Sequence, residues 1–170
     1  MKYTGRADCP QPGKRPGTEK FVELMCKRFG FTNLGTYANR PIRGGTTISV
    51  HSSGRACDLG WADPVKAAEV ARWLVDNYEA LGLEELHDYA GTTKKGTETW
   101  GRGWRCDRGN EVPGWRDYTA QQNAGTPGPS SRWYHLELSP AMADNERVVV
   151  KAWKGLTKPE IWVGKPKATK

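Results

Sequence analysis

The chain has 170 residues, of which 36% are hydrophobic, and it contains 20 glycines and 11 prolines. This length suits one domain with a hydrophobic core, and the composition argues against a helical bundle or a solenoid and for a loop-rich α+β protein. No apolar run is long enough to cross a bilayer, which argues against membrane insertion, and the net charge of +7 favours polyanionic partners.

In the N-terminal part, residues 1–16 are expected to form an extended leader that carries several prolines. A helix is predicted from Thr18 to Phe29, because Thr18 can cap it, apolar residues recur at helical spacing, and Gly30 follows. Residues 46–50 are rich in strand-forming types, and a strand is predicted from Cys57 to Trp61.

The middle of the chain carries the clearest helix signal. Asp63 followed by Pro64 is typical of a capped helix start, and the predicted helix runs from Pro64 to Leu81 with Gly82 as its stop. A strand is predicted from Glu84 to Tyr89.

In the C-terminal part, a loop rich in glycine, proline and serine, Asn123 to Ser131, leads into a predicted strand from Trp133 to Leu138. The valine run within Arg147 to Trp153 predicts a last strand that closes the sheet, and a basic tail, residues 164–170, ends the chain. The expected architecture is α+β: a small, mostly antiparallel sheet flanked by two main helices, in a single domain over residues 1–170.

The cysteines and the N-terminus bear on where the protein works. The four cysteines form no C-x-x-C pair, which argues against a finger-type zinc site. The N-terminus lacks the apolar segment of a secretory signal, so cytoplasmic synthesis and reduced thiols are expected. Activity outside the cell would allow disulfides, with partners that the sequence leaves open.

Two segments predict a metal site. The run from Ser49 to Asp58 follows the pattern S-x-H-x-x-G-x-A-x-D and supplies His51 and Asp58, while the predicted strand that begins at Trp133 supplies His135. Two imidazoles and one carboxylate are a normal ligand set of a catalytic zinc, with a fourth position left for water. The alternative is that the two histidines are hydrogen-bonded residues in unrelated places.

The same run resembles the zinc motif of the D-alanyl-D-alanine carboxypeptidase and L-alanyl-D-glutamate endopeptidase family, which includes phage endolysins and shares its fold with the Hedgehog signalling domain. The stretch from Trp100 to Arg105, with His135 to Leu138, is similar to members from actinobacteria and their phages. The resemblance covers about residues 40–140. It implies a Hedgehog-like fold, zinc held by His51, Asp58 and His135, and peptidoglycan stem peptides as substrate.

The catalytic acid or base departs from the pattern of that family. Its members carry an acidic residue three positions before the last ligand or a histidine two positions before it, and Arg132 and Trp133 stand there in this chain. Glu137, two residues after His135, is the remaining candidate for the base, and its alternative role is to orient a ligand imidazole. Arg132 is a candidate for polarising the scissile carbonyl or for holding a substrate carboxylate, and the alternative is a solvated loop residue.

Further candidates surround this set. Arg43, Ser49, Trp104 and Trp133 are expected to contact substrate, with Trp104 and Trp133 nearest the cleft, although large aromatics also serve as core residues. The third histidine, His87, is expected to be packed or exposed, and the alternative is that strand alternation brings it to the wall of the cleft.

These features support three functions. The first is a zinc-dependent peptidoglycan peptidase, a phage endolysin or its catalytic domain, which is made without a signal peptide and acts at the bacterial cell wall after release. The second is a catalytically silent protein of the same fold that binds the cell wall or a protein. The third, a basic protein associated with nucleic acid, rests on charge alone, since no nucleic-acid motif is present. A monomer is favoured.

Overall fold

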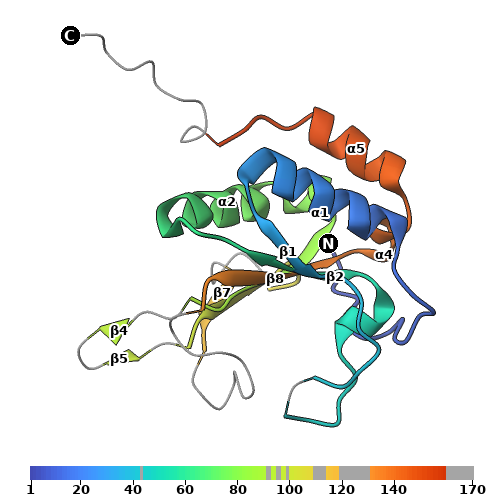
Figure 1. Cartoon of the computed structure of the whole chain (residues 1–170), viewed down its shortest axis with the longest axis horizontal. Coiled ribbons are helices and arrows are strands. Elements are labelled where there is room, and N and C mark those ends of the chain that lie inside the picture. Colours follow the sequence, from blue (N-terminus) through green and yellow to red (C-terminus); the bar gives the residue numbers. More distant parts are fainter. Residues whose placement is uncertain are drawn as a thin grey trace.

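A six-stranded antiparallel sheet organises the protein (Figure 1), with strand order β1-β2-β8-β3-β6-β7. In the computed structural model the described residues are 1–42, 44–90, 93–94, 97–98, 100–108, 114–118 and 131–159. The strands of the sheet are β1 (Thr32–Gly35), β2 (Ala56–Gly60), β3 (Leu83–Asp88), β6 (Arg102–Arg105), β7 (Trp115–Asp117) and β8 (Trp133–Leu138). Strands β4 (Thr93–Lys94) and β5 (Thr97–Glu98) form a separate pair.

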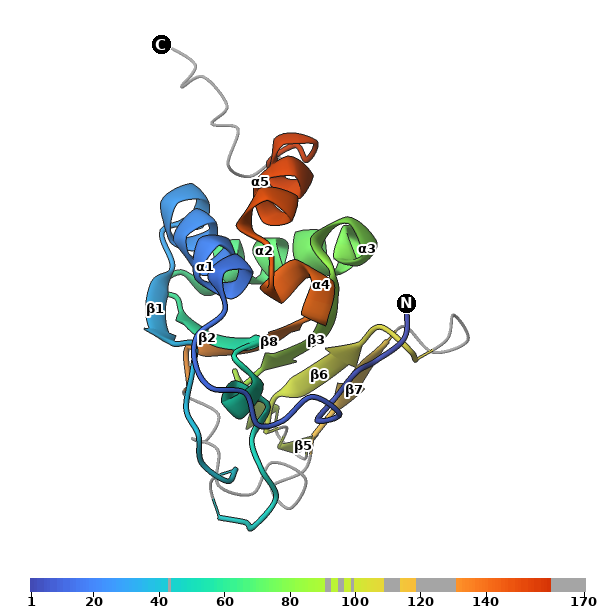
Figure 2. The ribbon, with the colours of Figure 1, turned by 90° about the vertical axis from the view of Figure 1, so that its right-hand side faces the viewer.

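The helices gather on one side of the sheet, and the N-terminal segment crosses the other side (Figure 2). They are α1 (Pro16–Phe29), α2 (Pro64–Asp76), α3 (Tyr78–Leu81), α4 (Pro140–Ala143) and α5 (Glu146–Lys154), with a short 3₁₀ helix, η1 (Val50–Ser53), on the opposite side. The α+β class with an antiparallel sheet is confirmed. Two long helices, α1 and α2, pack on the sheet as expected, and a third long helix, α5, packs against α1.

Alternation along the strands separates an apolar face from a polar one. Successive side chains of a strand point to opposite faces of a sheet. The apolar face packs against α1 and α2, and α5 packs in turn on α1. The buried strand residues of this face are Cys57, Leu59, Leu83, Leu86, Trp104, Tyr134, Leu136 and Leu138. We call the opposite side the polar face, and it carries Asp58, Glu85, His87, His135 and Glu137.

The predicted last strand, Arg147 to Trp153, is wrong, because these residues form helix α5. The Asn145 side chain caps the helix by accepting hydrogen bonds from the backbone N–H groups of Arg147 and Val148. Val149 and Trp153, four residues apart, are buried on one side of it. The helical period of the buried residues, together with the cap, outweighs the strand preference of three consecutive valines.

The predicted strand leading to His51 is also wrong. His51 lies in η1, whose N-cap is Ser49, and the Ser49 hydroxyl accepts a hydrogen bond from the His51 N–H. The hydroxyls of Ser52 and Ser53 donate to backbone carbonyls three residues earlier, which favours a tight turn over a strand. Gly54 ends the turn with φ of 71°, and a Cβ at this position would lie 2.6 Å from the Gly13 carbonyl oxygen.

Smaller differences concern helix ends. Helix α1 begins at Pro16, so Thr18 is buried inside the helix and does not cap it. The predicted helix from Pro64 to Leu81 divides into α2 and α3 at Asn77, with Gly82 in the left-handed conformation after α3. Strand Trp133 to Leu138 is confirmed residue for residue.

Three predicted segments lie partly or wholly outside the described residues: Arg43, all but the last residue of the loop Asn123 to Ser131, and the basic tail 164–170. Residues 1–15 contain turns but neither helix nor strand. Among the residues that the structure describes, no helix has the length and apolar character needed to cross a membrane.

Candidate metal centre

Strand register places three chemically active side chains in one row across the polar face. Asp58 on β2 is paired with His135 on β8, and His135 is paired in turn with His87 on β3. A second row beside it contains Glu137 on β8, Glu85 on β3 and Arg105 on β6. The segments Glu85-Leu86-His87 and His135-Leu136-Glu137 therefore run antiparallel with like residues opposite each other.

Three ligand atoms meet beside the first row. His51 Nε2 lies 3.2 Å from Asp58 Oδ1, and His135 Nδ1 lies 3.0 Å from the same oxygen. The ligand atoms of His51, Asp58 and His135 all lie within 4.8 Å of one another, so this group could hold a metal ion. The two predicted segments are brought together because β2 and β8 are adjacent, while η1 leads directly into β2.

The outer nitrogen of each imidazole faces an acceptor. His51 Nδ1 lies 3.4 Å from the carbonyl oxygen of Thr36, and His135 Nε2 lies 3.2 Å from Glu137 Oε1. If each outer nitrogen donates its proton there, each inner nitrogen presents a lone pair toward Asp58. Metal-binding histidines commonly have this arrangement, in which an outer acceptor sets the tautomer and the ring orientation. The donor set and its surroundings therefore fit a divalent cation.

The electrostatics of the metal-free group reflect the same contacts. Burial opposes ionisation of Asp58, but hydrogen bonds from His135 and His51 outweigh it and hold the pKa of Asp58 well below its usual range. Burial likewise opposes protonation of His135, but its hydrogen bonds to Asp58 and Glu137 raise its pKa to about 10. Without metal, a proton on His135 therefore takes the place that a cation would fill.

A second histidine–carboxylate pair stands beside the metal group. His87 Nε2 lies 2.9 Å from Glu85 Oε1, and the His87 ring centroid lies 5.6 Å from that of His135. The hydroxyl of Tyr89 lies 3.3 Å from His87 Nδ1, and the hydroxyl of Tyr118 lies 3.3 Å from Nε2. His87 is packed, as expected, but it is packed beside the metal group, which is the place that strand alternation offered as the alternative. Its place is decided by its register opposite His135.

Glu137 is engaged at both oxygens. One oxygen faces His135 Nε2, and the other lies 3.1 Å from the hydroxyl of Tyr3. The residue is 3% exposed. These contacts match the alternative role given to Glu137 from the sequence, that of orienting a ligand imidazole, better than the role of a free base.

The other residues predicted to contact substrate or to take part in catalysis lie in different parts of the fold. The hydroxyl of Ser49 caps η1, and Trp133 packs against Tyr89 on the polar face with ring centroids 4.1 Å apart. Trp104 lies in the hydrophobic core on the apolar face, so the prediction that it borders the metal group is wrong. Arg132 is exposed and lies 3.4 Å from the Ala62 carbonyl oxygen, which its guanidinium can reach as a donor.

Arg55, inside the motif, was not singled out from the sequence, yet its side chain is fully buried. Its guanidinium donates to Asp8 and lies 3.3 Å from Glu84 Oε2, and it also donates to the carbonyl oxygens of Gly5 and Leu138. It thereby connects the N-terminal segment to strands β3 and β8. A buried arginine with this many partners holds the polar face together.

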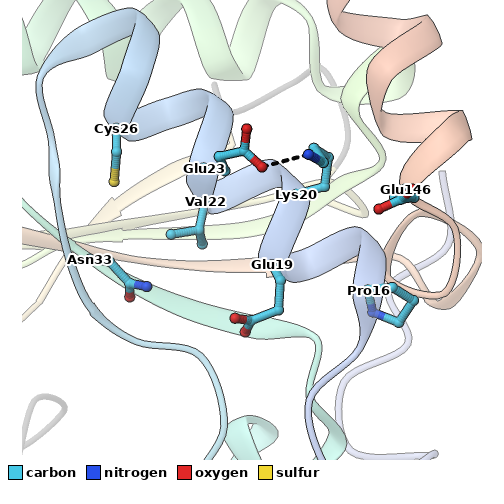
Figure 3. Close-up of a pocket in the computed structure, with 8 residues that line it drawn as sticks. All are labelled: Pro16, Glu19, Lys20, Val22, Glu23, Cys26, Asn33 and Glu146. Carbon is cyan, nitrogen blue, oxygen red and sulfur yellow. Dashed lines mark hydrogen bonds and ion pairs between the residues drawn. The ribbon is translucent and has the colours of Figure 1, made fainter.

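A surface pocket of about 540 Å³ lies in the helix layer, where α1, β1 and the start of α5 meet (Figure 3). Its charged groups include Lys20 and Glu23, which pair with each other, and Glu146 from α5. It contains no histidine and lies across the sheet from the metal group. We assign it no part in the chemistry of the metal group.

In a comparison with protein families, a family model described as "VldE, C-terminal domain" matches residues 10–124. The match includes His51 and Asp58 and stops before His135. No curated protein and no solved structure matches the chain. The likeness to the D-alanyl-D-alanine peptidases thus stays a prediction from sequence motifs. The family match spans well over half of the chain, which therefore belongs to the VldE C-terminal domain family.

Proposed function

We propose that the protein is a zinc-dependent peptidase that cleaves peptidoglycan stem peptides, as a phage endolysin or its catalytic domain. The observation that carries the proposal is the convergence of His51 Nε2, Asp58 Oδ1 and His135 Nδ1, with the outer nitrogen of each imidazole facing an acceptor. Two histidines and one carboxylate leave a coordination position free, as catalytic zinc requires and structural zinc does not.

In this proposal the three ligands hold zinc, which when bound supplies Lewis acidity and activates water for attack on a peptide carbonyl. Asp58, with 21% of its side chain exposed, is the most accessible of the three and marks the side from which substrate arrives. Trp133 and Tyr89 form an aromatic wall next to the row of ligands, suited to packing against substrate.

The described residues offer two proton acceptors near the ligands, Glu137 and His87. Glu137 is already bound to His135 and Tyr3, whereas His87 is oriented by Glu85, in the way that a carboxylate orients a catalytic imidazole. Substitution of Glu137 and of His87, each in a separate variant, shows which of the two accepts the proton.

The substrate class rests on two sequence features. The S-x-H-x-x-G-x-A-x-D run resembles the motif of enzymes that act on wall peptides, and the charge of +7 suits a wall that carries acidic polymers.

The test measures new amino termini released from purified peptidoglycan by the zinc-loaded protein. Release is expected with zinc, and chelation or Asp58→Ala should reduce it to background, a loss of at least about 100-fold. Glu137→Gln and His87→Gln are then compared at full zinc occupancy, and the variant with the larger fall in rate identifies the proton acceptor. Zinc-loaded wild-type protein that releases no amino termini would contradict the proposal.

A second candidate function is a catalytically silent metal-binding protein of the same fold that recognises the cell wall or a protein. The observation that favours it is the engagement of both Glu137 oxygens, together with Arg132 and Trp133 at the positions of the usual acid or base. Stoichiometric zinc and binding to peptidoglycan sediments without cleavage would support this function.

A further inference from the structure

The N-terminal segment reaches the second row of the polar face through Tyr3. The Tyr3 hydroxyl lies 2.7 Å from Glu85 Oε2 and 3.1 Å from Glu137 Oε2. Each of these carboxylates uses its other oxygen to face a histidine, Glu137 toward His135 and Glu85 toward His87. One hydroxyl thus joins the two histidine–carboxylate pairs.

The Tyr3 hydroxyl reduces the electrostatic repulsion between Glu85 and Glu137. Glu85 and Glu137 are directly opposite each other on neighbouring strands and are nearly buried, so two negative charges there repel each other. The hydroxyl has one proton, which it donates to one carboxylate or shares between the two, and this lowers the repulsion and restrains both side chains. Burial and the nearby charges of Glu137 and Glu85 raise the pKa of Tyr3, which keeps the hydroxyl protonated and able to donate.

Other contacts hold Tyr3 in place. The guanidinium of Arg105 lies over its ring, 4.4 Å from the centroid. The backbone N–H and hydroxyl of Thr4 donate to the two oxygens of Glu84, at 3.0 and 2.7 Å. Asp8 and the Gly5 carbonyl accept from the buried Arg55. The segment from Tyr3 to Asp8 is therefore attached to the sheet by side chains of strands β3, β6 and β8 and by Arg55, which directly precedes β2.

We propose that Tyr3 is a positioning residue of the metal centre: its hydroxyl holds Glu137 against His135 and Glu85 against His87, so that metal affinity depends on a residue that touches no ligand. The inference rests on the metal site of the proposed function and extends it to the N-terminal segment. It does not depend on peptidase activity, because metal binding is measured without substrate.

The experiment measures the affinity of the full chain for Zn²⁺ against a chromophoric chelator, and the visible absorption spectrum of the Co²⁺ form. Loss of a partner that orients a ligand imidazole weakens metal binding by about 10- to 100-fold. Tyr3→Phe, which removes one oxygen atom, is expected to weaken Zn²⁺ binding by about 10-fold and to change the Co²⁺ spectrum, since His135 is no longer held in one orientation. Tyr37→Phe is the matched control, because its hydroxyl donates to the carbonyl oxygen of Gln11 and not to a carboxylate of the polar face.

A double-mutant cycle separates positioning from a general loss of stability. If Tyr3 acts through Glu137, Tyr3→Phe has a much smaller effect on affinity in a Glu137→Gln background, whereas a merely structural role gives additive effects. Wild-type affinity and an unchanged Co²⁺ spectrum in Tyr3→Phe overturn the inference alone. A wild-type protein that binds neither ion overturns it together with the proposed function. Metal binding that depends on Tyr3 without release of amino termini supports the inference and rejects the peptidase.

Discussion

The two faces of the sheet are built from the same strands and differ in almost every physical respect. On β8, Tyr134, Leu136 and Leu138 pack into an apolar core beneath the helices, while His135 and Glu137 between them carry the metal group and its support. The apolar face is stabilised by removal of hydrocarbon from water. The polar face buries charges, which is favourable only when each has a partner.

The difference between the faces shows how stability and chemistry are divided in this protein. Substitutions on the apolar face should change the free energy of unfolding and leave the ligand set intact. Substitutions on the polar face should change metal affinity first.

The largest effect is expected from removal of a ligand. His51→Ala should weaken Zn²⁺ binding by more than about 100-fold, beyond the range seen for partners outside the ligand set. His87→Ala also removes an imidazole, from the position opposite His135 on β3, and this variant should retain the metal. Metal analysis after dialysis measures both, and undiminished zinc in His51→Ala would remove His51 from the site.

The next effect is expected on the apolar face. Leu136 is fully buried between His135 and Glu137 along the strand, and Leu136→Ala should destabilise the protein by about 2–5 kcal/mol through lost burial and a cavity. The metal stoichiometry of the folded variant should not change. Val148→Ala, at an exposed position on α5, is the control and should cost less than about 0.5 kcal/mol in denaturant unfolding. Equal costs at the two positions would contradict the burial of Leu136 in the apolar core.

The smallest effect is a pH dependence of the metal-free protein. Folding raises the pKa of His135 to about 10, whereas an unfolded imidazole has a pKa of about 6.5. A raised pKa means that the contribution of His135 to stability is fully present below pH about 6.5 and is lost as the pH rises through about 10.

The free energy of unfolding without metal should therefore fall by about 1 kcal/mol or more over that interval. The decrease should be smaller in His135→Gln, which has no imidazole to titrate, and smaller in zinc-saturated protein, where the metal replaces the proton. A metal-free wild-type protein whose stability does not fall over this interval, or falls no more than that of His135→Gln, would show that His135 is not held as a cation.

Features that depend on neighbouring residues could be predicted from the sequence more often than features that depend on residues far apart in the chain. Strand Trp133–Leu138 and the left-handed Gly82 and Gly54 are set by neighbouring residues, and all were predictable. Helix α5 was mistaken for a strand because adjacent valines favour strands locally, while the Asn145 cap and the packing of Val149 and Trp153 favour a helix.

The sequence by itself determined the chemistry available to this protein: a ligand set in S-x-H-x-x-G-x-A-x-D and H-x-E, and alternation that separates polar from apolar side chains. Only the tertiary structure decided which of those side chains meet. The register of β3 against β8 shifts between Leu83 and Glu85, and this places Glu85 and His87 opposite Glu137 and His135. Side-chain alternation is a property of one strand, whereas register and the approach of Tyr3 depend on packing between segments far apart in the chain, because those contacts form only when the whole sheet closes.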